Sequence, residues 1–157
     1  MSEANPVYLK FRERALRWQD PQAPLGSPSG VIVETGYPEG VVSLVVMSDG
    51  TVSLFFSGGG AVLHAGLFDG PAQAARDLAM AAMHFAPQMQ PALDLAMPKK
   101  GMVNIFVLVD GIVRSAHGKM SDFGDNRLPL SPLFQVAMNV IAAIRALPPE
   151  ATRPKSA

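Results

Sequence analysis

VVSLVVMSDGTVSLFF, residues 41–56, consists of two apolar runs joined by the polar turn Ser48-Asp49-Gly50. An Asp-Gly pair between runs rich in β-branched and aromatic residues predicts a β-hairpin, because type I′ turns need positive φ at both central residues. The same signature recurs at Asp110-Gly111, between the apolar run Met102–Val109 and a return strand Ile112–His117. The sequence therefore predicts two antiparallel hairpins.

Two more strands are predicted next to the first hairpin. Val31–Thr35 is β-branched and bounded by glycines, and Ala61–Ala65 has the pattern of a further short strand. Strands joined by tight hairpins pair antiparallel. We expect one antiparallel or mixed sheet of about five to six strands.

Three helices accompany these strands. Val7–Gln19 carries one apolar stripe, whereas Pro71–Phe85 and Pro132–Leu147 each follow a capping residue and are apolar on nearly every face. The Gly118–Leu130 segment reads as a polar loop. The predicted class is α+β, with a sheet built from hairpins, two long apolar helices on one face and an N-terminal helix.

The predicted organisation has four parts. Residues 1–20 form an N-terminal helical segment, and residues 21–30, with three prolines and two glycines, form a linker loop. Residues 31–147 form a single α+β domain, and residues 148–157 form a mobile tail.

The composition excludes several classes. The chain has 157 residues, is 48% hydrophobic and 17% charged, and contains no cysteine, so it has no disulfide framework and no thiol nucleophile. Its 13 basic and 13 acidic residues cancel, which argues against nucleic-acid binding. The N-terminus has no signal-peptide pattern, and the longest apolar helix falls short of the roughly 20 residues needed to insert into a membrane. We expect a cytoplasmic protein.

The neutral total hides an uneven distribution of charge. Residues 21–98 sum to −5, from one base and six acids, while residues 1–20 sum to +1 and residues 99–157 to +4. Segments of opposite net charge can pair within the domain or across a subunit interface. The alternative is that these charges are solvated without regard to their order in the chain.

The apolar helices predict association. Two helices on one sheet face would each leave an outer side exposed, and a large apolar patch is unusual on a monomer. The surplus surface is interpreted as a homodimer interface, with two alternatives: cover by the N-terminal helix, or binding of a different protein or apolar ligand. The interface candidates are Leu78, Met80, Met83, Phe85, Phe134, Met138 and Ile141.

No catalytic or metal-binding constellation stands out. The three histidines lack ligand spacing, and no phosphate-binding loop or nucleophile elbow occurs. We expect no cofactor, no metal and no catalytic residue. The loop after the second hairpin is the most polar stretch between two apolar elements, and two histidines end predicted strands. The ligand-binding candidates are His64, His117, Lys119, Asp122, Asp125 and Arg127.

Three functions remain open. The first is a non-catalytic homodimeric interaction or regulatory module. The second is a small-molecule binding or sensing domain, with a pocket between sheet and helices edged by the Gly118–Leu130 loop. The third is a hydrolytic enzyme that uses His64, His117 and a carboxylate, which requires the two histidines to lie within about 10 Å.

The arrangement over residues 7–147 resembles the roadblock and profilin-like families of small α+β domains. The resemblance rests on Val41–Phe56, the helix from Pro71, Val103–Ser115 and the helix from Pro132. The chain departs from the roadblock pattern in its extra strand at 31–35 and in having only two clear strands after the crossover helix. The resemblance implies a dimerising adaptor that binds small GTPases, motors or other regulators.

Overall fold

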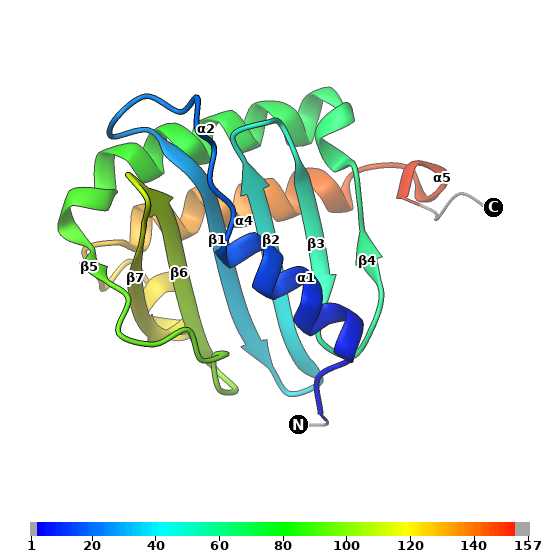
Figure 1. The fold of residues 1–157 in the computed structure, drawn as a ribbon. Coiled ribbons are helices and arrows are strands. Elements are labelled where there is room, and N and C mark those ends of the chain that lie inside the picture. The colour runs from blue at the N-terminus through cyan, green and yellow to red at the C-terminus, as the bar shows by residue number, and fades with distance from the viewer. Residues whose placement is uncertain (1–2, 153–157) are drawn as a thin grey trace.

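A computed structural model describes residues 3–152, in which one open antiparallel sheet of seven strands carries helices on both faces. The strand order is β4-β3-β2-β1-β6-β7-β5, so the long strands β1 and β6 lie at the centre (Figure 1). The α+β class and the antiparallel sheet are therefore confirmed.

The strands follow the predicted hairpins closely. They are β1 (Pro28–Tyr37), β2 (Gly40–Met47), β3 (Val52–Phe56), β4 (Ala61–Val62), β5 (Gln90–Pro91), β6 (Met102–Val109) and β7 (Ile112–Lys119). The helices are α1 (Pro6–Leu16), α2 (Asp69–Phe85), α3 (Met120–Gly124), α4 (Ser131–Arg145) and α5 (Pro149–Thr152), with 3₁₀ turns η1 (Ala65–Leu67) and η2 (Ala86–Gln88).

The two Asp-Gly turns differ. In the β6–β7 hairpin, Asp110 and Gly111 have φ of 54° and 79°, as a two-residue type I′ turn requires. In the β2–β3 hairpin only Gly50 has positive φ, and the Met47 amide donates to the Thr51 carbonyl across a three-residue loop. The predicted hairpin is present, but its turn is not type I′.

β5 and α3 are among the short elements that the sequence did not predict. The sheet has seven strands rather than five to six, because Gln90–Pro91 pairs with β7 at the edge of the sheet. Proline is tolerated there, since an edge strand can do without one N–H. The predicted Gly118–Leu130 loop contains α3, which at five residues is too short to show helical periodicity.

The main core lies between the sheet and the α2–α4 layer. Both helices pack side by side on the same face of the sheet (Figure 1) and bury side chains such as Leu78, Leu133 and Phe134 against the strands. Arg76, Asp77, Gln135 and other polar residues occupy much of the outer surface of this layer. The outer surface is therefore less apolar than the helix composition predicts.

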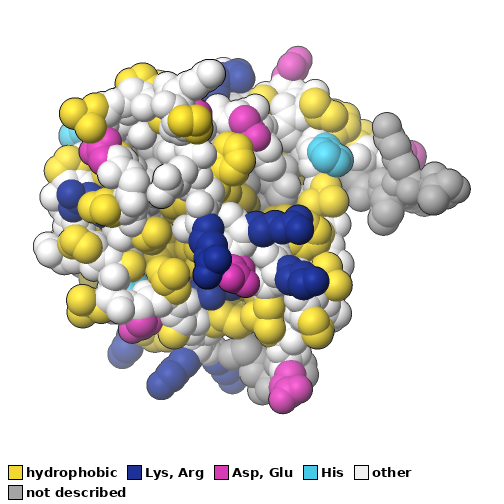
Figure 2. Space-filling model, viewed as in Figure 1, with side chains coloured by type: hydrophobic (Ala, Val, Ile, Leu, Met, Phe, Trp, Pro, Cys, Tyr) yellow, Lys and Arg dark blue, Asp and Glu magenta, His cyan; other side chains and the backbone are white. Residues whose placement is uncertain are grey.

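The opposite face of the sheet is covered by α1. The Phe11 ring stacks on Phe55 of β3 at a centroid separation of 4.9 Å, over a second cluster that includes Ile32 and Phe106. Basic side chains of α1 gather on the outside of this face (Figure 2). The alternative in which the N-terminal helix covers α2 and α4 is therefore wrong, because α1 lies on the other side of the sheet.

Within residues 3–152, no helix is long and apolar enough to cross a membrane. Part of the predicted tail, Pro149–Thr152, forms α5, and residues 153–157 of that tail lie outside the described residues.

Candidate functional site

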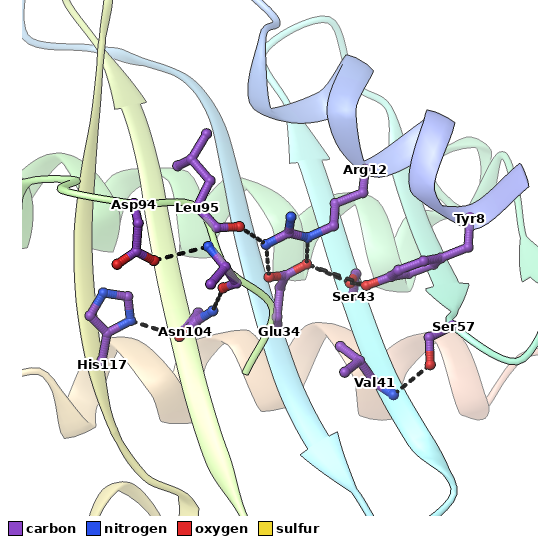
Figure 3. Close-up of polar contacts among 11 residues, drawn as sticks. Tyr8, Arg12, Glu34, Val41, Ser43, Ser57, Asp94, Leu95, Asn104 and His117 are labelled. Atoms are coloured by element: carbon purple, nitrogen blue, oxygen red, sulfur yellow. Dashed lines mark hydrogen bonds and ion pairs between the residues drawn. The ribbon is translucent and has the colours of Figure 1, made fainter. Parts of the chain in front are cut away.

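A row of polar side chains crosses the sheet beneath α1. The register places Ser43 of β2 opposite Glu34 of β1, Glu34 opposite Asn104 of β6, and Asn104 opposite His117 of β7. Residues directly opposite on neighbouring strands share a face and contact each other. Figure 3 shows this polar row on the face that α1 covers.

Glu34 is the centre of the row. Its side chain is fully buried, and Arg12 of α1 donates to it through Nε and Nη2, both at 2.8 Å. Ser43 donates to the same carboxylate at 2.9 Å, and the Tyr8 hydroxyl lies 2.7 Å from Ser43 Oγ. A two-pronged arginine contact of this kind is among the stronger charge-assisted pairs in proteins.

The surroundings alter two pKa values. Burial raises the pKa of Tyr8 to about 12, and the charge of Glu34 acts in the same direction. Burial by itself lowers the pKa of Arg12, but the hydrogen bond and charge of Glu34 outweigh it, so this pKa is raised. The tyrosine is therefore neutral and the arginine charged at physiological pH.

At the other end of the row, Asn104 orients the ring of His117. Asn104 donates through Nδ2 to the Ala96 carbonyl at 2.8 Å, so its Oδ1 faces the Nδ1 of His117 at 2.7 Å. An amide oxygen only accepts, which requires a proton on Nδ1 of His117. The exposed ring therefore presents Nε2 outward, beside Asp94 and a hollow of about 450 Å³.

The row ties two segments to the sheet. Arg12 Nη2 also donates to the Leu95 carbonyl at 2.5 Å, so α1 and the segment of residues 92–98, called the strap here, are held by one guanidinium. The strap is joined to β7 as well, since the Ala92 amide donates to the Val113 carbonyl. Arg12 neutralises Glu34 and holds both α1 and the strap on the sheet, so the row has a structural role. These residues are called the lock here.

A different part of the sheet carries hollows lined by apolar and charged residues. The Tyr37 hollow, of about 380 Å³, is lined by Tyr37, Glu39, Val42, Phe56, Ser57 and Arg145. A neighbouring hollow of about 640 Å³ also reaches Tyr37 and is lined by Met120, Ser121, Asp125, Phe134 and Met138. Both lie between the sheet and α4, and the second is edged by the predicted Gly118–Leu130 segment.

The two predicted histidines lie far apart. His64 follows β4 and His117 lies in β7, and five steps of the strand order separate β4 from β7. At about 4.8 Å for each step, the strands are roughly 24 Å apart. A hydrolytic site that combines His64 with His117 is therefore wrong.

The remaining ligand candidates sit around α3. Arg127 lies 3.7 Å from an Asp122 oxygen and 3.8 Å from an Asp125 oxygen, in exposed ion pairs. Lys119 is exposed at the end of β7, and only Asp125 of this group lines a described hollow. Within residues 3–152, no group of three or more His, Asp or Glu side chains is placed to hold a metal ion.

The interface candidates divide into three groups. Leu78 and Phe134 are core residues and present almost no surface. Phe85, Met138 and Ile141 are partly buried against the core, whereas Met80 and Met83 are 68% and 45% exposed. The exposed apolar surface of α2 is therefore concentrated at its last turns.

Sequence reasoning missed the residues that build the lock and the Tyr37 hollow. These are Tyr8, Arg12, Glu34, Asn104, Tyr37, Glu39 and Arg145. One signal was available for the lock: Glu34 interrupts a β-branched strand, and a charge in a buried strand needs a partner.

No protein-family model, no curated protein and no solved structure matches this chain.

Proposed function

We propose that this protein is a homodimeric interaction module without catalytic activity of its own. The observation that supports it is the exposed apolar surface at the end of α2, where Met80 and Met83 lie three residues apart on one side of the helix. Methionine is flexible and polarizable, and it recurs at adaptable protein-binding surfaces.

Leu25 extends this surface. It is 91% exposed, in a loop whose Gly26 amide donates to Asp110 Oδ1 at 2.7 Å. The next residue, Ser27, lies 3.8 Å from the Met83 sulfur, which places the loop beside α2. Leu25, Met80 and Met83 together form the methionine patch.

A second copy of the chain is the partner that we propose for the methionine patch. Arg76 and Asp77, which have opposite charges, lie on exposed positions one turn before Met80. In a twofold dimer the same surface meets itself, so opposite charges on one surface can pair across the axis. Twofold dimers are also the commonest protein assemblies.

Charge substitutions in the patch test the proposal. Met80→Glu and Met83→Glu place carboxylates on exposed positions, so the fold is expected to survive while dimerisation is lost. Leu67→Glu is the matched control, because Leu67 is 82% exposed at the opposite end of α2. Sedimentation velocity should show dimers for the wild type and the control, and monomers for the two patch variants. Dimers that persist in both patch variants would exclude the patch as the interface.

The resemblance to roadblock-like domains favours the same type of function. We propose on that basis that the dimer acts as a cytoplasmic adaptor for a further protein.

A further inference from the structure

The Tyr37 hollow combines apolar walls with two charges of opposite sign. Val42 and Phe56 line it from β2 and β3, and Tyr37 from the end of β1. Glu39 lies in the β1–β2 turn and Arg145 is the last residue of α4. The consecutive strands β1 to β3 and the distant end of α4 therefore bring an acid, a base and an apolar surface to one place.

Glu39 and Arg145 are both exposed, and neither has an ion-pair partner within the described part of the chain. The ion pairs found among residues 3–152 are Arg12–Glu34, Arg17–Glu13, Arg127–Asp122 and Arg127–Asp125. Glu39 and Arg145 take part in none of them, although both line the same hollow. The carboxylate and the guanidinium are free to bind a ligand that carries the complementary charges.

We propose that the Tyr37 hollow binds a free hydrophobic α-amino acid. Arg145 would pair with the α-carboxylate and Glu39 with the α-ammonium, both as charge-assisted contacts. The side chain would pack on Val42, Phe56 and the Tyr37 ring. A free amino acid carries both charges on the carbon that bears its apolar group, whereas a residue inside a polypeptide carries neither.

The dimensions agree with this ligand class. Small-molecule sites span about 300–1,000 Å³ and are mostly apolar, with a few polar groups that orient the ligand. The Tyr37 hollow, at about 380 Å³, lies at the small end of that range.

This binding is independent of the proposed dimer. Met80 and Met83 do not line the Tyr37 hollow, so the methionine-patch variants should retain amino-acid binding. Failure of one proposal therefore leaves the other standing.

Calorimetric or NMR titration with L-phenylalanine and L-leucine tests the site. The wild type should bind with a Kd below about 1 mM. Arg145→Gln and Glu39→Gln should each weaken binding at least about tenfold, as expected for the loss of a charge-assisted contact. Arg14→Gln is the matched control, since Arg14 is an exposed helical arginine of α1 outside this hollow, and it should leave the Kd unchanged.

Two ligand analogues separate the charges. 3-Phenylpropionate lacks the ammonium and phenethylamine lacks the carboxylate, so each should bind at least about tenfold more weakly than phenylalanine. Three results would overturn the proposal. These are no binding of either amino acid at about 10 mM, binding unchanged in Arg145→Gln and Glu39→Gln, and phenylpropionate binding as tightly as phenylalanine. Thermal unfolding of each variant shows that the fold is retained.

Discussion

Removing Arg12 should convert the lock beneath α1 into a buried, unpaired charge. In Arg12→Met the apolar part of the side chain is kept, but Glu34, which has no exposed side-chain surface, loses both arginine contacts. Breaking a buried ion pair by removing one partner costs about 3–5 kcal/mol. The hydroxyls of Ser43 and Tyr8 still reach the carboxylate, at 2.9 and 3.4 Å, which favours the lower end of that range.

Urea unfolding at pH 7 measures this loss. Fluorescence of Trp18, the one tryptophan, follows the region next to α1, and far-UV circular dichroism follows the secondary structure as a whole. We expect Arg12→Met to lower the free energy of unfolding by about 3 kcal/mol. The matched control is Arg12→Met with Glu34→Gln, which removes the buried charge and should recover part of this loss. A loss below about 1 kcal/mol in Arg12→Met would refute the lock.

Two further predictions concern Tyr8 of α1 and Gly36 of β1. Because the pKa of Tyr8 is raised to about 12, the folded state favours the neutral phenol, so this stability is present below about pH 10 and is lost as pH rises towards 12. The free energy of unfolding of Tyr8→Phe, measured as pH rises, should not show that loss. The same pH dependence in the variant and the wild type would contradict the prediction. Gly36→Ala should cost about 2 kcal/mol or more, because a Cβ there overlaps the Lys99 carbonyl. Thermal unfolding measures it, and a variant as stable as the wild type would show that the backbone at Lys99 can move away at little cost.

Local signals predicted most of the fold. Asp110-Gly111 specifies a two-residue turn by backbone conformation alone, and the proline-initiated helices α2 and α4 begin within two residues of their predicted starts. The sequence did not predict α3, β5 or α5, which are too short for a periodic pattern to show.

The candidate sites were much harder to predict. The Arg12–Glu34 pair joins residues 22 apart and exists only because α1 crosses the second face of the sheet. Nothing in the helix pattern of Val7–Gln19 specifies which surface the helix covers. Glu39 and Arg145 are separated by most of the chain, and the fold alone brings them to one hollow. Conversely, His64 and His117 both end predicted strands, but strand order places them near opposite edges of the sheet.

The mass of the wild-type protein in solution tests the central claim most directly. Light scattering at micromolar concentration and ordinary salt should give twice the 16.6 kDa mass of one chain, and the double variant Met80→Glu, Met83→Glu should give the single-chain mass. A wild-type mass equal to one chain would contradict the proposal that this protein works as a homodimer.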